Sequence, residues 1–212
     1  MSEKSLHELL DAPIDSDLVS RRDQAGKTFS YLESWAVLHE MNQIFGHTGW
    51  ATSVEDIKCV LNETFTNEKD GRTGYRVAYT AQVTVNVLEE KQEVHHFRGG
   101  CYHTDVGYGD GTSYEHAGKA HESAIKEAVS DASKRAIRHL GGRMGLYLYD
   151  KSQKNVIDYN KQAKQLLNVA ALKIKEGKIE GDIGEIEKNM MRKPTGREAF
   201  EYMKQITEGV SK

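Results

Sequence analysis

Three cationic residues lie close together in the segment SDASKRAIRHLGG, residues 130–142. A helix here turns about 100° per residue, so Arg138 falls between Lys134 and Arg135 within a sector about 100° wide. The opposite side carries Ala128, Ala132, Ala136 and Leu140. Converging cations on one side and a packing face on the other suit contact with a phosphate backbone. The plainer interpretation is a solvated face that Asp131, four residues before Arg135, partly neutralises.

The overall charge argues against binding through general basicity. The net charge is −3 and the pI is about 6.3. Residues 151–212 contain 13 Lys and Arg against 9 Asp and Glu, and residues 1–150 contain 16 against 23. If the chain binds nucleic acid, the binding must come from a local line of cations that repeating subunits make continuous.

Length and composition predict an ordinary soluble protein. The 212 residues suffice for one domain with a core and an appendage, and 38% of them are hydrophobic. We expect no membrane segment and no secretory signal. The only two cysteines, Cys59 and Cys101, form no CxxC pattern, which favours free thiols in a reducing compartment. The expected location is cytoplasmic.

The middle of the chain predicts an α+β fold. Every second residue from 75 to 87 is apolar, as in a strand with one buried face. Residues 53–65 and 92–106 predict the strands before and after it, and the glycine-rich stretch GYGDGTSY predicts a loop before a helix at 118–140. The result is a three-stranded antiparallel meander, packed by a long helix with an alanine face, with flanking helices.

Both ends of the chain predict further helices. Ser30 and Glu33 resemble a capping box for a helix that ends at Gly46. Residues 155–176 and 196–209 look helical, but many charges and few large apolar residues predict no second independent core. We therefore divide the chain into a core, residues 1–151, and a helical C-terminal extension, residues 152–212.

Catalytic and cofactor motifs are weak. The glycines of residues 107–111 lack the Lys-Ser/Thr ending of a nucleotide-binding loop, and a turn explains them better. No GxSxG sequence occurs, so we expect no enzyme and no cofactor. A metal site is also considered, because several ligand types lie close together: His95, His96, Cys101, His103 and Asp105. Side chains in a row along one face of a strand converge poorly on a metal ion. We therefore favour the interpretation that they are exposed polar residues.

Several separated motifs in this order resemble one family. FGHTGW, YHTDVGYG, KEAVSDASKRAIRHLGG and LYDK are similar to the Rad52-type single-strand annealing proteins and their phage relatives, from about Val19 to Lys151. The resemblance implies a β-β-β-α unit that assembles into multi-subunit rings and anneals complementary single strands without ATP, in homologous recombination and double-strand break repair. The short length implies a phage or prophage version.

The resemblance also implies which residues bind DNA. An inner groove takes Arg21, Lys134, Arg135 and Arg138, and a second, outer site takes Lys151 and Arg72. One family lysine falls on Glu115 here, with Lys119 nearby as a replacement. Tyr31 and Phe45 are candidates for stacking on bases or for simple helix packing. Implied partners are single-stranded DNA, further copies of the chain, and a host single-strand-binding protein or a phage exonuclease.

Three other classes of protein remain open at this stage. A double-stranded RNA- or DNA-binding module without annealing activity also combines a three-stranded sheet with helices. A structural oligomer would form rings indifferent to oligonucleotides. A zinc hydrolase would contain metal and lose its activity to a chelator.

Overall fold

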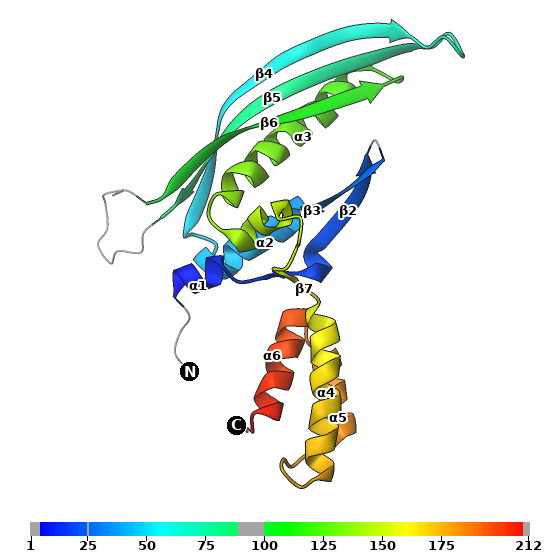
Figure 1. Cartoon of the computed structure of the whole chain (residues 1–212). Helices are drawn as coiled ribbons and strands as arrows, with labels where there is room; N and C mark the ends of the chain where they lie inside the picture. The colour runs from blue at the N-terminus through cyan, green and yellow to red at the C-terminus, as the bar shows by residue number, and fades with distance from the viewer. Residues whose placement is uncertain (1–4, 25, 89–99, 210–212) are drawn as a thin grey trace. The chain divides into compact units, whose positions relative to one another are not determined.

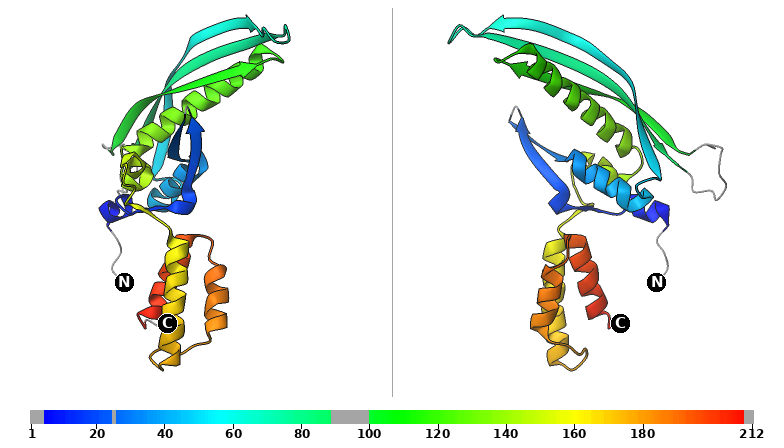
Figure 2. Two further views of the ribbon diagram at one scale, coloured as in Figure 1. Left: turned by 45° about the vertical axis from the view of Figure 1, so that its right-hand side comes forward. Right: turned by 180° about the vertical axis from the view of Figure 1, so that it is seen from behind.

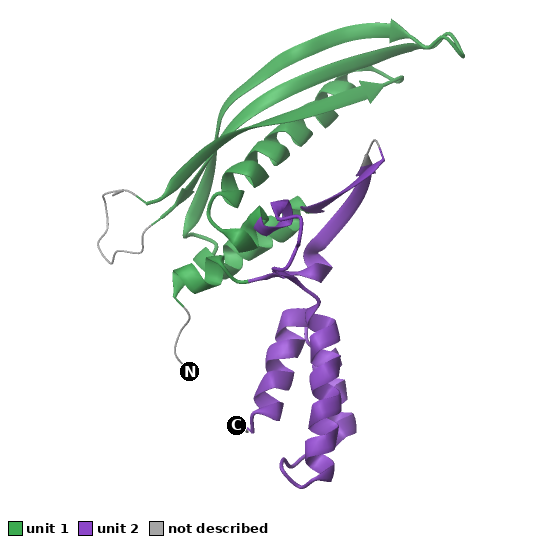
Figure 3. Cartoon of the chain, viewed as in Figure 1, with its two compact units in different colours: residues 1–12, 32–146 green, residues 13–31, 147–212 purple. Residues whose placement is uncertain are grey.

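The computed structural model describes residues 5–24, 26–88 and 100–209 (Figure 1). The chain divides into two compact units, coloured separately in Figure 3. Unit 1 contains residues 1–12 and 32–146, and unit 2 contains residues 13–31 and 147–212. Among the described residues, none of the helices has the length and apolar character needed to cross a membrane.

Unit 1 is built on the predicted three-stranded antiparallel sheet. Its strands are β4 (Trp50–Thr66), β5 (Thr73–Val87) and β6 (Tyr102–Ser113), in the order β4-β5-β6 (Figure 1). Tyr79 at the middle of β5 lies opposite Cys59 on β4 and Gly109 on β6. The predicted third strand, 92–106, is displaced, because the observed strand begins at Tyr102, and residues 89–99 lie outside the described part.

Helix α3 (Ala117–Arg138) packs along one face of this sheet, over β5 and β6 (Figure 2). The alternating residues of β5 supply the sheet side of the core, where Val77, Val83 and Val85 are fully buried. The helix supplies an alanine at every fourth position, all fully buried: Ala120, Ala124, Ala128, Ala132 and Ala136. The predicted alanine face and the sheet that it covers are therefore confirmed.

Glycines of β6 bring the helix and sheet backbones close together. Gly107, Gly109 and Gly111 alternate along the strand and are buried against α3. A Cβ atom at Gly109 would lie 2.3 Å from the Ala124 carbonyl oxygen and 2.4 Å from the Ala128 nitrogen. The prediction of a glycine-rich loop is therefore wrong. These glycines lie in a strand, because at alternate positions only a residue without a side chain fits beneath the helix.

Shorter elements complete unit 1: α1 (Leu6–Leu10), α2 (Ser34–Phe45) and the 3-10 turn η2 (Gly142–Met144). Helix α2 ends at Gly46, as predicted, where φ is +73°. The predicted capping box is wrong, because Glu33 is the N-cap and makes no side-chain capping bond. A buried carboxylate on α2, Glu40, pairs with Arg143 of η2 and so holds the segment that follows α3.

Unit 2 begins with short strands that the sequence did not predict. Strand β1 (Ile14–Asp15) pairs in parallel with β7 (Val156–Ile157), and β2 (Val19–Gln24) pairs with β3 (Lys27–Leu32). The 3-10 turns η1 (Ser16–Leu18) and η3 (Leu146–Tyr149) flank them. Ser30, the expected helix cap, lies in β3, and its hydroxyl accepts a hydrogen bond from the Gln153 side chain at 3.1 Å.

The rest of unit 2 is a three-helix cluster with its own core. It consists of α4 (Tyr159–Lys175), α5 (Ile183–Met191) and α6 (Gly196–Thr207). Its buried residues are Ala163, Ala170, Ile186, Met190, Ala199 and Met203. The expectation of no second core is therefore wrong. Alanines let the helices approach closely, flexible methionines fill the space between them, and α5 supplies Ile186 and Met190 from a stretch for which no helix was predicted.

Candidate nucleic-acid interface

Two arginines from the last turns of α3 converge on one carboxylate of β6. The Arg135 Nε donates to Asp105 Oδ1 at 3.0 Å, and Arg138 Nη2 lies 4.0 Å from Asp105 Oδ2. His139, just after the helix, contacts the same Oδ2 through its Nε2 at 3.2 Å. Asp105 therefore gathers three basic side chains at the C-terminal end of α3, where a helix dipole also favours positive charge.

These side chains differ in how much surface they offer. The side chain of Arg135 is 43% exposed, whereas those of Arg138 and Asp105 are 17% and 16% exposed. Lys134, beside Arg135, is half-buried. The shared sector of the three cations is thus present on the observed helix, and Arg135 offers more of it to a ligand than Arg138 does.

Burial and hydrogen bonding oppose each other at Asp105. Burial alone would raise the pKa of this carboxyl, but hydrogen bonds from Arg135, the Val106 amide and His139 outweigh it and hold the pKa below its ordinary value. Asp105 is therefore ionised wherever the chain is folded near neutral pH. The carboxylate fixes the geometry of the arginines and also competes with any phosphate that approaches them.

The sequence suggested a different neutralising residue, Asp131. In the structure, Asp131 Oδ2 accepts a hydrogen bond from the Tyr108 amide at 3.3 Å, and Glu127 Oε2 accepts one from the Asp110 amide at 3.2 Å. Both carboxylates therefore satisfy donors along the edge of β6. Asp105 stands two residues before Gly107 and so shares the helix-facing side of β6, a placement that the sequence indicates only if the glycines are read as part of the strand.

Of the metal candidates, Asp105 is the centre of the arginine cluster, and His103 and Cys101 adjoin it through His139. The rings of His103 and His139 stack with centroids 5.4 Å apart, and Cys101 Sγ lies 3.1 Å from His103 Nε2. Burial, together with the neighbouring His139, lowers the pKa of His103. Within residues 5–24, 26–88 and 100–209, no group of three or more His, Cys, Asp or Glu is placed to hold a metal ion. His95 and His96 lie outside these ranges.

Comparison with known proteins decides the family. A model of the Rad52/22 family, described as double-strand break repair proteins, matches residues 2–167. The chain belongs to this family. The match includes the whole sheet, α3 and the Asp105 cluster.

Individual Rad52/22 relatives agree with this assignment. The Schizosaccharomyces pombe DNA repair and recombination protein rad22 is 32% identical over 147 residues, which is 69% of this chain and 28% of the relative. The rti1 protein of the same yeast is 35% identical over 144 residues, 68% of this chain and 35% of the relative. Saccharomyces cerevisiae RAD52 is 34% identical over 143 residues, which is 67% of this chain and 27% of the relative. The chain spans about a third or less of these relatives.

The remaining residues implied by the Rad52-type resemblance lie in several places. Arg21 is exposed on β2 in unit 2, next to Arg22, whose guanidinium lies 5.7 Å from the centre of the Tyr31 ring. Lys151 is exposed in the turn after η3, also in unit 2. Arg21 belongs to unit 2 and the α3 cations to unit 1, and their joining in one groove stays a prediction.

The outer-site candidates of unit 1 are engaged with nearby acids. Arg72, in the β4–β5 turn, pairs with Asp70 at 2.7 Å and lies 5.1 Å from the centre of the Tyr114 ring. The hydrogen bond from Arg72 holds the pKa of Asp70 below its ordinary value. Lys119 forms an ion pair with Glu115 at 2.8 Å. Its positive charge therefore neutralises Glu115, the residue that stands in place of a family lysine, and adds no further cation to the outer site.

Proposed function

We propose that this chain binds single-stranded DNA and anneals complementary strands without nucleotide hydrolysis, as a multi-subunit assembly acting in recombination and repair. The observation that carries the proposal is the cationic end of α3, where Arg135 and Arg138 are held by Asp105 next to Lys134. Membership of the Rad52/22 family supports the same function. Arg21, Lys151 and Arg72 are further proposed contacts.

In the proposed mechanism, the α3 cations bind phosphates and leave the bases exposed. Arginine offers planar donors that match phosphate oxygens, and Lys134 adds an ammonium group. The strand is then tested by pairing with an incoming complement rather than by the protein. Since each neutralised phosphate releases counterions, affinity should fall steeply as salt rises.

Strand β4 supports the proposed assembly with further copies of this chain. Among the strands that the structure describes, it pairs with β5 alone, and almost all of its residues are exposed. Val54 and Ile57 are 50% and 42% exposed, although they stand opposite the buried Val83 and Ala81 of β5. The helix-covered apolar face therefore continues beyond α3 onto β4. An uncovered edge with an apolar face favours packing against another protomer.

One experiment tests this function directly. The full chain is mixed with two complementary labelled oligonucleotides without ATP, and particles are imaged with and without a long single strand. We expect faster annealing than in the protein-free control and multi-subunit particles. Preference for duplex RNA or DNA without annealing would support the duplex-binding module instead. Particles indifferent to oligonucleotide would indicate a structural oligomer, and either result contradicts the proposal.

The other implied partners stay predictions. A single-strand-binding protein or an exonuclease would be detected by binding of the purified partner to the full chain. The phage or prophage origin also stays a prediction, since the relatives described above are fungal.

A further inference from the structure

Helix α4 has an unusual charge for this chain. Its sequence, YNKQAKQLLNVAALKIK, contains four lysines and no acidic residue in 17 positions. Its neighbours α5 and α6 both carry glutamates. The excess positive charge of the C-terminal region is therefore concentrated on one helix of the three.

Three of these lysines share one side of α4 with two amides. At about 100° per residue, Lys161, Lys164, Gln165, Asn168 and Lys175 fall within a sector about 100° wide. All five are exposed, and we call them the α4 basic stripe. The fourth lysine, Lys173, belongs to the interior side, where its Nζ donates to the Thr207 carbonyl oxygen at 2.7 Å and ties α4 to α6.

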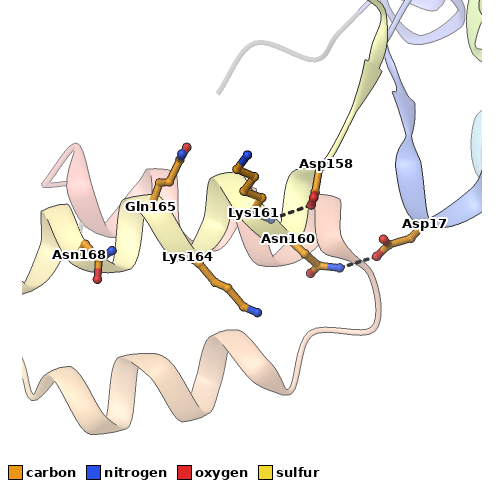
Figure 4. Close-up of a pocket in the computed structure, with 7 residues that line it drawn as sticks. All are labelled: Asp17, Asp158, Asn160, Lys161, Lys164, Gln165 and Asn168. Atoms are coloured by element: carbon orange, nitrogen blue, oxygen red, sulfur yellow. Dashed lines mark hydrogen bonds between the residues drawn. The ribbon is translucent and has the colours of Figure 1, made fainter. Parts of the chain in front are cut away.

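The N-terminal part of the stripe borders a depression of about 450 Å³ (Figure 4). Lys161 and Gln165 extend to one side of the helix in this view, and Lys164 and Asn168 to the other. A ligand lying along the helix between them would meet donors from both sides. The amide and ammonium groups that line the depression are therefore spread along the helix, as an extended ligand requires, and do not converge on one point.

Two carboxylates also line this depression, at its N-terminal end. Asp158 is the N-cap of α4 and accepts the Lys161 backbone N–H at 2.7 Å, and Asp17 accepts a hydrogen bond from the Asn160 side chain. Both acids are thus engaged by groups other than the lysine ammoniums. Across the described residues, no carboxylate lies within the 4.0 Å ion-pair distance of the side-chain nitrogens of Lys161, Lys164 or Lys175.

We propose that the α4 basic stripe binds the phosphate backbone of single-stranded DNA, as a contact surface separate from α3. The inference rests on the proposed function for its ligand. From residue 161 to 175 the helix rises about 21 Å, enough to follow several nucleotides. Lysines bind phosphates, and the amides of Gln165 and Asn168 both donate and accept, which suits phosphates and the open edges of unpaired bases. The C-terminal extension thereby becomes part of the DNA-binding surface.

The test compares two triple variants of the full chain. Lys161→Ala, Lys164→Ala and Lys175→Ala together remove the stripe. Lys178→Ala, Lys188→Ala and Lys204→Ala remove the same charge elsewhere in the same unit. At about 0.7 per contact, loss of three phosphate contacts should lower the log-log salt slope of binding by about 2. Affinity at 0.1 M salt should fall roughly tenfold to a hundredfold. The control triple should leave the slope within about 0.5 of the unaltered chain.

Each outcome has a distinct meaning. If both triples weaken DNA binding equally, the effect comes from total charge alone, and the inference is overturned. Unaltered DNA binding by the stripe variant would overturn it too. Loss of binding to an acidic peptide of alternating Asp and Glu, with unaltered DNA binding, would assign the stripe to a protein partner and overturn it too. Failure of the unaltered chain to bind single strands would contradict the proposed function itself. Alanine favours helix, so circular dichroism should show unchanged helix content in both triples.

Discussion

Arg135 on α3 and Asp105 on β6 form an ion pair across 3.0 Å, thirty residues apart in sequence. The pair joins the end of the helix to the third strand and orients a guanidinium that remains partly exposed. Because Asp105 also contacts Arg138 and His139, one carboxylate connects three basic side chains of the cationic end. Asp105 is therefore both a support for the proposed DNA contact and a competitor for it.

Replacement of this carboxylate separates the two roles. We expect Asp105→Asn to strengthen single-strand binding a few-fold at low salt, because the negative charge of Asp105 no longer competes with phosphate for Arg135. The same change should lower the free energy of unfolding by about 1–3 kcal/mol, since the mostly buried Arg138 loses its anionic neighbour. Fluorescence anisotropy and chemical denaturation measure these effects. Weaker binding with unchanged stability would contradict this account.

The pKa shifts predict how stability depends on pH. The pKa of Asp105 and that of His103 are both lower in the folded chain than their ordinary values. Each contribution is therefore present above the unfolded-state pKa and lost as the pH falls through the folded-state value. The melting temperature should fall in two steps as the pH is lowered. The first step begins below about pH 6.5 and comes from His103, and the second lies in the range where carboxylates titrate and comes from Asp105.

Two variants assign these steps. His103→Gln should flatten the first step and Asp105→Asn the second, each leaving the other in place. Both steps unchanged in both variants would show that other groups set the pH dependence.

Close packing of β6 against α3 predicts a severe effect at one glycine. Gly109→Ala places a methyl group within 2.4 Å of the α3 backbone, so we expect a loss of about 3 kcal/mol or more, or failure to fold. Gly118→Ala is a matched control in α3 itself, where the new Cβ meets only the His116 ring at 3.4 Å. That change should stabilise the chain by up to about 1 kcal/mol. Equal melting temperatures for the two variants would contradict the assigned packing.

The exposed apolar face of β4 predicts an assembly variant. Ile57→Lys should reduce the particle size in analytical ultracentrifugation, because a charge on that face opposes packing against another protomer. The fold should survive, since Ile57 is 42% exposed. Ser53→Lys places the same charge on the opposite face of β4 and should leave the size unaltered. Dissociation by Ser53→Lys alone would assign assembly to the other face.

The sequence predicts those parts of the fold whose residues repeat with a clear period. Alternation from Tyr75 to Val87 marks β5, and alanines at every fourth residue mark the buried side of α3. The glycines of β6 mislead, because glycine also serves where two backbones approach, which local sequence does not distinguish from a turn. The core of the unit 2 helices is hidden for another reason, although two of the three helices are predicted. Most of its buried residues are alanine and methionine, which a search for large apolar residues overlooks.

The candidate site is only partly predictable. The shared sector of Lys134, Arg135 and Arg138 follows from helix geometry alone. Their partner does not follow from it, because Asp105 is remote in sequence and its neighbours Cys101 and His103 indicate only a candidate metal ligand. Strand alternation with Gly107 places Asp105 on the helix-facing side, but the helix turn that it meets depends on the packing of α3 on the sheet.

The salt dependence of single-strand binding by α3 variants tests the central claim most directly. Lys134→Ala and Arg135→Gln should each weaken binding and lower the log-log salt slope by about 0.7, with unchanged particle size. Lys126→Ala, on the same helix but paired with Glu122, should leave the slope unaltered. If all three variants bind and anneal like the unaltered chain, the cationic end of α3 is not the DNA contact.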